Sequence, residues 1–465
     1  MTKTKIGLVS LGCPKNLVDS EEMLGALAET GQAELVDDRR ADVLVVNTCA
    51  FIESAKQESI DAILRAVKRK ERGDIQKIIV TGCLAQRYAS ELSADIPEVD
   101  AFLGIQSAGQ IAGAVFGTSN RGRALPMLSP EKVSVSANNQ VEPVGDKYPL
   151  IPPARLRATA PWTAYLKVSE GCDHACTFCS IPSFRGRHRS KPMERVEEEA
   201  RRLVDAGVVE VNLIAQDTTA YGMDLYSELA LSRLLERLGK VNGLRWVRLL
   251  YCYPTMMTDR LIGTMADTPN VAHYVDVPLQ HGDDGMLKHM KRGGSVASYT
   301  RLFARLRSAM PDIAIRTTFL VGFPGEDEAA FSNLERFVAD SQFDRLGVFE
   351  YSPEENTPGY EMTPRVPSRL AVKRKNALMA RQQPISLARN EALVGREIDV
   401  LIEGHKGDDR VARSWRDAPE IDGTVRVKGA GLQTQPGEFL RVRVTRALPY
   451  DLVAVPVASG MATDL

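Results

Sequence analysis

Strand-forming and helical segments alternate six times between residues 162 and 351, and this alternation restricts the fold more than any other feature of the sequence. Short apolar runs separated by helices predict parallel strands, because parallel neighbours need a helix-sized connection. The pattern predicts an open, partial (β/α)6 barrel over residues 161–365, in which chemistry belongs at the carboxyl ends of the strands. The six predicted strands are Thr163–Val168, Val208–Ala215, Arg245–Leu250, Ala272–Val277, Ile313–Leu320 and Arg345–Tyr351.

Residues 1–118 repeat this alternation on a smaller scale and predict an N-terminal parallel α/β domain. The predicted strands are Lys5–Leu11, Asp42–Asn47 and Lys77–Thr81, with helices between them. The first of these, followed by Cys13, weakly resembles a lipoprotein signal. Its apolar part is only about seven residues long, at the lower limit for a signal core, and the recurrence of similar segments favours a strand.

The rest of the chain has other patterns. Residues 119–160 are rich in Pro, Ser and Asn and predict a linker, and residues 366–394 predict a basic helical connection. Over residues 395–465, short alternating strands predict a small antiparallel β-barrel. Its predicted strands are Glu397–Ile402, Gly423–Val427 and Phe439–Val444. The fold class is therefore an α/β multidomain chain with a C-terminal barrel.

Composition narrows the functional classes. Apolar residues make up 44% of the chain and charged residues 26%, and the net charge is −1, so no overall field attracts nucleic acid or membrane. No apolar run approaches the ~18 residues of a membrane span. Seven cysteines in a long chain without a convincing export signal indicate the cytoplasm, where clustered cysteines bind metals more often than they form disulfides.

Three cysteines, Cys172, Cys176 and Cys179, directly follow the first barrel strand. Three thiolates this close can converge on an iron–sulfur cluster if the backbone wraps around it as a loop. They would leave one iron of a four-iron cluster open to a substrate. The alternative is a zinc site with His174 as the fourth ligand, although zinc sites usually use paired motifs.

A second set, Cys13, Cys49 and Cys83, is spaced by 36 and 34 residues, and each cysteine follows a predicted strand. Because the carboxyl ends of parallel strands share one edge, this spacing predicts a second three-cysteine cluster with an open iron. The alternative is three unrelated buried cysteines. Cys252 has no partner cysteine nearby and is interpreted as a core residue.

The first set, with Phe178 before its last cysteine, resembles the radical S-adenosylmethionine (SAM) superfamily. The resemblance implies that the open iron chelates SAM, whose reductive cleavage yields a 5′-deoxyadenosyl radical. It also implies cofactor contacts at strand ends, although ordinary βα turns remain the alternative at each position. The implied cofactor-binding residues are Phe178, Gln216, Asp217, Gln280, Gly322 and Phe323.

Two three-cysteine sets followed by a small barrel resemble the methylthiotransferases over essentially the whole chain. This resemblance implies conversion of C–H to C–S–CH3, two 4Fe-4S clusters, SAM, an external electron donor, a sulfur donor and a C-terminal TRAM domain. Several segments resemble the branch that modifies the β-carbon of an aspartate in small-subunit ribosomal protein twelve. They are residues 11–21, 47–60, 172–192, 216–222 and 419–423.

The charge of the C-terminal segment agrees with a protein substrate. Residues 395–465 carry ten Lys and Arg against eleven Asp and Glu, which does not favour RNA binding. The same pattern of cysteines nevertheless fits the alternative of a tRNA base methylthiotransferase. An iron–sulfur electron carrier or RNA-binding scaffold fits less well, because carriers ligate every iron. The basic segment Arg185–Lys191 either holds an anionic group, such as the SAM carboxylate or a substrate aspartate, or is a solvent-facing loop.

Overall fold

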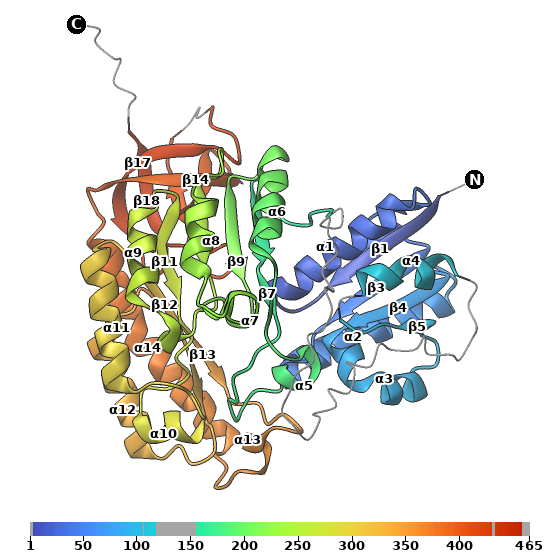
Figure 1. Cartoon of the computed structure of the whole chain (residues 1–465), viewed down its shortest axis with the longest axis horizontal. Coiled ribbons are helices and arrows are strands. Elements are labelled where there is room, and N and C mark those ends of the chain that lie inside the picture. Colours follow the sequence, from blue (N-terminus) through green and yellow to red (C-terminus); the bar gives the residue numbers. More distant parts are fainter. Residues whose placement is uncertain (1–2, 106, 118–154, 430–432, 458–465) are drawn as a thin grey trace, which may run out of the picture.

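The computed structural model describes residues 3–105, 107–117, 155–429 and 433–457, which form an N-terminal, a central and a C-terminal part (Figure 1). The N-terminal part is a parallel sheet in the order β2-β1-β3-β4-β5. Its strands are β1 (Thr4–Ser10), β2 (Ala33–Leu35), β3 (Val43–Thr48), β4 (Lys77–Gly82) and β5 (Ala101–Phe102). Its helices are α1 (Pro14–Glu29), η1 (Asp38–Arg40), α2 (Glu53–Glu71), α3 (Cys83–Asp95) and α4 (Ala108–Phe116).

Helices cover both faces of this sheet, as the continuous apolar run of β3 predicts. Side chains alternate along a strand. Leu44 and Val46 therefore join one core, with α2 and α3, whereas Val43 and Val45 join another, with α1 and α4.

The central part is an open parallel sheet in the order β13-β12-β11-β10-β9-β6. The strands are β6 (Thr163–Lys167), β9 (Glu210–Ile214), β10 (Trp246–Leu249), β11 (Val271–Asp276), β12 (Ala314–Val321) and β13 (Arg345–Glu350). Its longer helices cover the outer face (Figure 1). They are α6 (Met193–Asp205), α8 (Leu231–Leu238), α9 (Asp259–Asp267), α11 (Val296–Ala309) and α12 (Glu328–Ser341).

Shorter elements lie in the loops around this sheet. They are β7 (Ser169–Glu170), α5 (Ile181–Arg185), β8 (Arg189–Ser190), α7 (Met223–Tyr226), η2 (Pro254–Met256), α10 (Asp284–His289) and α13 (Pro358–Glu361). The inner face of the sheet is where all three parts meet. Tyr165, Ile214 and Tyr274 pack there with Val18 of α1 and Ala418 of the C-terminal part.

Helix α14 (Ser368–Glu391) leads from the central part to a closed barrel in the order β14-β15-β16-β18-β17. The strands are β14 (Glu397–Lys406), β15 (Asp409–Ser414), β16 (Val425–Val427), β17 (Phe439–Ala447) and β18 (Leu452–Pro456). The small barrel predicted from the sequence is confirmed. One of its pairings differs from the prediction, because β16 and β18 run parallel while the other neighbours are antiparallel.

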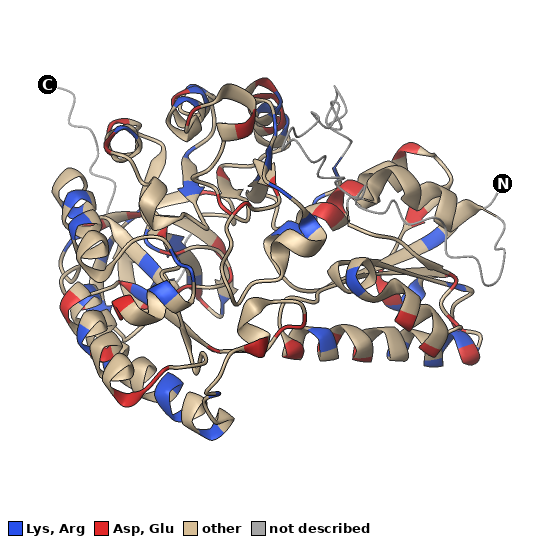
Figure 2. Ribbon diagram, turned by 60° about the horizontal axis from the view of Figure 1, so that its bottom comes forward, with Lys and Arg blue, Asp and Glu red and all other residues tan. Residues whose placement is uncertain are grey.

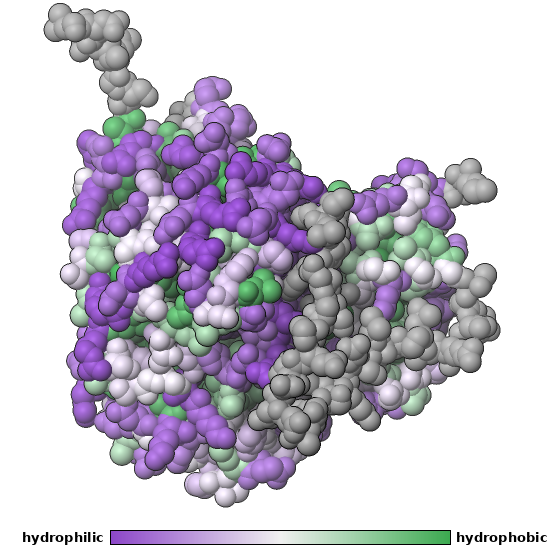
Figure 3. Space-filling model, viewed as in Figure 1, coloured by the Kyte–Doolittle hydropathy of each residue, from purple (hydrophilic) through white to green (hydrophobic). Residues whose placement is uncertain are grey.

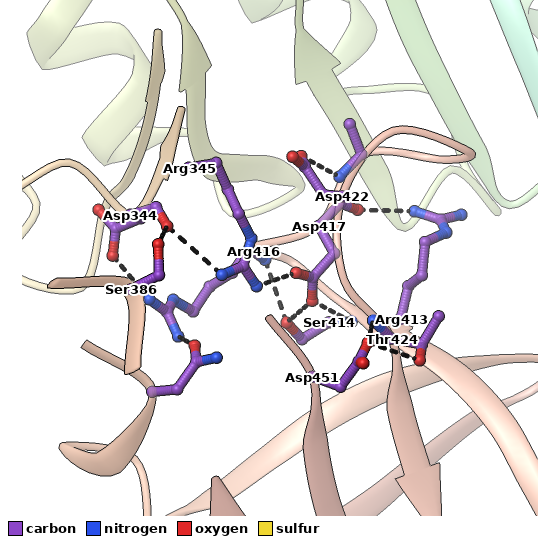
Figure 4. Close-up of polar contacts among 12 residues, drawn as sticks. Asp344, Arg345, Ser386, Arg413, Ser414, Arg416, Asp417, Asp422, Thr424 and Asp451 are labelled. Atoms are coloured by element: carbon purple, nitrogen blue, oxygen red, sulfur yellow. Dashed lines mark hydrogen bonds and ion pairs between the residues drawn. The ribbon is translucent and has the colours of Figure 1, made fainter. Parts of the chain in front are cut away.

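A buried ionic network fixes the barrel to the amino ends of β9 and β13, opposite the cysteine loops. Figure 4 shows Arg416 reaching Asp344 and Arg345 reaching Asp417, each at 2.6 Å. Ionic contacts of this kind join the two parts at several points along their boundary. The C-terminal barrel therefore closes one end of the central sheet and leaves the other end to the N-terminal part.

The outer surface mixes both signs of charge. Lys and Arg are interspersed with Asp and Glu along the outer helices in Figure 2, and one face of the molecule in Figure 3 is mostly hydrophilic with scattered apolar residues. Within the described ranges, no helix combines the length and the apolar character needed to cross a membrane.

All six strands predicted for the central part are present, as are the three predicted at the N-terminus. The predicted strand at Lys5–Leu11 is β1, at the interior of its sheet rather than in a signal segment. Of the predicted linker 119–160, residues up to 154 lie outside the described ranges. From there on, Arg155 pairs with Glu199 of α6 at 3.0 Å and with Glu21 of α1.

Candidate active site

The first cysteine set lies in an irregular loop between β7 and α5, at the carboxyl end of β6. Backbone hydrogen bonds fix the loop at both ends. The amide of Cys172 donates to the carbonyl of Gly186 at 3.1 Å, and that of Thr177 donates to the carbonyl of Met290 at 3.1 Å. The backbone thus has the loop conformation that the spacing requires for three converging thiols.

Burial dominates the electrostatics of this loop. It raises the pKa of Cys172 to about 11 and that of Cys179 to about 12, and the Cys176 thiol adds to both shifts. Arg292 acts in the opposite direction on Cys179, and its Nη1 lies 3.8 Å from the Cys176 sulfur. A cationic iron core would reverse the effect of burial and favour the thiolates. These residues therefore fit an iron–sulfur cluster.

His174 does not fit the alternative of a zinc ligand. Its ring stacks on Tyr253 with centroids 3.7 Å apart, and its Nε2 lies 2.7 Å from Asp217 Oδ2. Among the residues described, no three His, Cys, Asp or Glu side chains are placed to hold a single metal ion. A four-iron cluster takes ligands that stand further apart than those of one ion, so this finding bears on a single-ion zinc site and not on a cluster.

The predicted cofactor residues after β9 both adjoin the cysteine loop. Gln216 Nε2 donates a hydrogen bond to Glu170 Oε1 at 2.6 Å, and Glu170 lies two residues before Cys172. Asp217, besides meeting His174, accepts hydrogen bonds from the amides of Thr219 and Ala220. The carboxylate of Asp217 is thus held rigidly beside the loop.

Of the remaining predicted contacts, Gln280 follows the end of β11, Gly322 and Phe323 follow β12, and Phe178 lies in the cysteine loop. Gln280 has a positive φ of 76° and bridges to Phe319 through its backbone. Phe178 packs edge-on against Phe323 with ring centroids 6.5 Å apart. Gly322 has a φ of +79°, and a Cβ there would lie 2.6 Å from Ala371 of α14. Packing of α14 therefore gives a reason for this glycine that is independent of a ligand.

The second cysteine set lies at the carboxyl edge of the N-terminal sheet. Cys13 precedes α1, Cys49 follows β3 and Cys83 begins α3. Burial raises the pKa of Cys83 to about 12, and Cys13 and Cys49 add to that shift, so the three thiols lie within electrostatic range of one another. Gly12 has a φ of +89°, and a Cβ there would lie 2.8 Å from the Cys49 sulfur. Only glycine, which has no Cβ, lets the Cys49 side chain lie this close to the backbone at position 12.

One buried arginine connects the two cysteine sets. Arg185 of α5 donates to the Cys83 sulfur at 3.2 Å and to Asn16 Oδ1 at 2.6 Å. It also donates to Glu170 Oε1 at 2.8 Å, next to the Cys172 loop. Asn16 and Glu170 were not predicted as site residues, although they lie three and two positions from the predicted ligands Cys13 and Cys172.

The basic segment that begins at Arg185 is not a solvent-facing loop. Arg185, His188 and Lys191 are buried, and Lys191 pairs with Glu199 at 2.9 Å. Arg187 is exposed and pairs with Asp173. The anionic groups that this segment holds in the structure are therefore those of the protein itself.

Lys15 is another buried cation that the sequence analysis missed. Its Nζ lies 2.9 Å from the centre of the Tyr251 ring, and burial lowers its pKa to about 8. Cys252, next to Tyr251, is buried in the main core, as predicted, and all seven cysteines are free of disulfides.

The N-terminal part also reaches the far edge of the central sheet. Lys56 of α2 and Arg87 of α3 pair with the buried Glu354, after β13, at 2.9 and 3.0 Å. Together with the contacts of α1 at β6, these ion pairs hold the N-terminal part against both sides of the carboxyl end.

Comparison with known families agrees with this division. Residues 5–104 match a family described as uncharacterized protein family UPF0004, residues 166–338 match the radical SAM superfamily, and residues 394–457 match the TRAM domain. Among solved structures, the radical SAM methyltransferase TsrM of Kitasatospora setae has a TM-score of 0.56 at 15% identity. It covers 77% of this chain and 74% of its own, and this likeness concerns the fold.

Curated relatives are similar over nearly the full length. The ribosomal protein uS12 methylthiotransferase RimO of Desulforamulus reducens is 46% identical over 451 residues, which cover 96% of this chain and 98% of the relative. That of Geobacter sulfurreducens is 45% identical, with coverage of 97% and 98%. The three matched regions and this identity show that the chain belongs to the RimO family of radical SAM methylthiotransferases.

Proposed function

We propose that this protein replaces a hydrogen on the β-carbon of an aspartate in ribosomal protein uS12 with a methylthio group. The observation that carries the proposal is the link through Arg185, which contacts Cys83 of one cysteine set and Glu170 beside the other. Two cysteine sets joined in this way suit a reaction that needs hydrogen abstraction and sulfur insertion at one carbon. The identity with RimO relatives supports the same substrate.

The residues have separate tasks in this proposal. Cys172, Cys176 and Cys179 would hold the cluster that binds SAM, and Cys13, Cys49 and Cys83 would hold the auxiliary cluster. When bound, these groups supply reductive cleavage of SAM and the sulfur to be transferred. A reductant and a sulfur donor from outside the chain complete the reaction.

Other side chains shape the space for SAM. Gln216 and Asp217 present polar groups beside the first cysteine loop, and Phe178 and Phe323 form an apolar wall through their edge-on contact. The backbone of Gln280, held between Thr318 and Leu320 by hydrogen bonds of 2.9 and 2.8 Å, fixes the neighbouring strand end. Groups held in place by such contacts would orient a cofactor without further rearrangement.

The surface of the C-terminal barrel favours a protein over tRNA. Arg441 and Arg443 lie on one face of β17, but each is matched across the strand pair by an acid. Arg441 pairs with Asp399 at 3.3 Å and Arg443 pairs with Glu397 at 2.7 Å. These arginines are therefore neutralised and do not form a free basic patch for a phosphate backbone.

The test is a direct comparison of substrates. The enzyme reconstituted with iron and sulfide is incubated with SAM and a reductant, together with either uS12 or bulk tRNA, and both are analysed by mass spectrometry. We expect methylthio mass on uS12 at a single aspartate and none on tRNA. Modified tRNA with unmodified uS12 would contradict the proposal.

A further inference from the structure

Lys15 is a buried cation without an acidic partner. It lies in the first turn of α1, only 6% exposed, with the Tyr251 ring beneath its ammonium group and the Cys13 thiol within electrostatic range. Within the described residues, no carboxylate forms an ion pair with it. Buried charges in proteins are normally paired, because removing a charge from water is costly. This ammonium is thus placed to receive an anion from outside the chain.

The acids near Lys15 are already engaged with other cations. Glu170 accepts from Arg185 at 2.8 Å and pairs with Lys167 at 3.2 Å. Asp19 pairs with the same two cations, and its contact with Lys167 is the closer one. Three cations, Lys15, Lys167 and Arg185, therefore stand against two carboxylates, both of which are held by Lys167 and Arg185, and Arg185 also donates to the Cys83 sulfur.

The remaining carboxylate in range, that of Asp276, is likewise paired. It pairs with Arg316 at 2.9 Å, and it accepts a hydrogen bond from the amide of Tyr251 at 3.2 Å. It therefore holds the backbone that carries the Tyr251 ring, while the ring itself meets Lys15.

Lys15 also lies between the two cysteine sets. It follows Cys13 by two residues, and Tyr251 lies just past the end of β10. Two residues further on, Tyr253 stacks on His174 in the loop of the other set. The segment Tyr251–Tyr253 therefore links Lys15, which is beside one set, to the loop of the other.

We infer that Lys15 binds the side-chain carboxylate of the substrate aspartate. This inference rests on the proposed function and names the residue that would select its substrate. The carboxylate carbon of aspartate is bonded directly to the β-carbon, so an ammonium that fixes the carboxylate also fixes the carbon that reacts. A neutral nucleobase has no anionic group to offer, and it would leave the ammonium unpaired.

Three variants of the reconstituted enzyme test this role. Lys15→Met removes the charge and keeps the length of the side chain, and Lys15→Arg keeps the charge. Lys240→Met removes an exposed lysine at the end of α8 and is the matched control. Each protein is titrated with uS12 and with uS12 in which the modified aspartate is replaced by asparagine.

The expected result is a change in discrimination between the two forms of uS12. Wild type and Lys240→Met should bind the aspartate form at least ~30-fold more tightly than the asparagine form, since a desolvated charge pair carries an effect of this size. In Lys15→Met the ratio should fall to near one, and Lys15→Arg should keep most of it. The iron content per chain should equal that of wild type in all three variants.

Two results would overturn the inference. One is a Lys15→Met variant that still discriminates as wild type does. The other is loss of about half of the iron in that variant, which would make Lys15 a counter-ion of the auxiliary cluster instead. A wild-type enzyme that modifies tRNA and leaves uS12 unmodified would overturn the proposed function itself, and mass spectrometry of both substrates detects that separately.

Discussion

Both ends of the central sheet bury charged groups, but the partners of these charges differ between the two ends. At the amino end, Glu210 meets Arg413 at 2.5 Å and Arg248 at 3.0 Å. Asp344 meets Arg416 at 2.6 Å (Figure 4). Each of these carboxylates forms ion pairs with guanidinium groups. At the carboxyl end, thiols lie in two sets and Lys15 has an aromatic ring as its partner.

This difference separates a structural from a functional use of buried charge. A paired network holds the C-terminal barrel in one orientation, since a shift would leave several ions without partners. An incomplete set of charges instead leaves room for a ligand that completes it. Changes at the carboxyl end should therefore affect chemistry, and changes at the amino end should affect stability.

The largest effect is expected from removing the first cysteine set. Replacing Cys172, Cys176 and Cys179 with Ala should reduce SAM cleavage to the background level, because no protein ligands remain for the SAM-binding cluster. Replacing Cys13, Cys49 and Cys83 should block sulfur insertion while SAM cleavage continues. Release of 5′-deoxyadenosine and methylthio mass on uS12 measure the two steps.

Cys252→Ala is the matched control for these variants. Cys252 is buried in the main core and lies outside both sets, so this variant should keep the iron content and both activities of wild type. Equal loss of SAM cleavage from both triple variants would show that the division of roles between the sets is wrong.

The next largest effect is expected from a change at the amino end of the central sheet. Glu210→Gln leaves the buried Arg248 without a carboxylate and leaves Arg413 with Glu403 alone, which should lower the free energy of unfolding by about 3–5 kcal/mol. Tryptophan fluorescence during denaturation should detect it, because Trp246 packs on Phe439 of the barrel and Trp415 belongs to the barrel itself.

Glu198→Gln is the control for this stability effect. Glu198 pairs with Arg202 on the surface of α6, where both side chains are about half exposed, so its loss should have little effect. SAM cleavage by native Glu210→Gln should match wild type. A loss of cleavage without a loss of stability would contradict the separation of the two ends.

Acid should weaken the same network. Burial alone would raise the pKa of Glu210, but Arg413 and Arg248 outweigh it and lower the pKa to about 2. Arg416 and Arg389 likewise outweigh burial and lower the pKa of Asp344. Because these pKa values are lower in the folded than in the unfolded chain, their stabilisation is present above about pH 4.5 and is lost as the pH falls toward about 2.

The expected size of the acid effect is up to about 3 kcal/mol from Glu210. Burial raises the pKa of Asp422, so protonation of that group favours the folded state and opposes part of the loss. Unfolding of wild type and Glu210→Gln, followed by tryptophan fluorescence between pH 5 and 2, checks this. The variant should depend less on pH, and parallel curves for the two proteins would contradict the assignment.

Much of this architecture could be predicted from the sequence, because the signals are local. Each strand of the central sheet is an apolar run between helices, and each cysteine of the second set follows such a run. Strand β15 was missed because its sequence, DRVARS, has three charged residues in six. Its Arg413 is buried and pairs with Glu210, which lies 203 positions away in the chain. No local sequence pattern can indicate that pairing.

The same limit applies to the candidate site. Lys15 and Arg185 are charged residues in polar segments, and such residues are usually exposed. Their burial comes from the packing of α1 against the central sheet, which depends on contacts far apart in the sequence. The cysteine spacing therefore predicts the two ligand sets, whereas the cations between them become visible only in the folded chain.

The smallest effect is expected from breaking an arginine–glutamate ion pair that is exposed on the barrel surface. Arg443 of β17 lies opposite Glu397 of β14 in the strand register, at 2.7 Å, but its side chain is 57% exposed. Arg443→Gln should change the free energy of unfolding by less than about 0.5 kcal/mol, because water and salt screen an exposed pair. Denaturation followed by tryptophan fluorescence measures this, and modification of uS12 should be unchanged. A loss of modification without a loss of stability would instead place the substrate on the face of β17, and the barrel would then have a role in binding as well as in closing the amino end of the sheet.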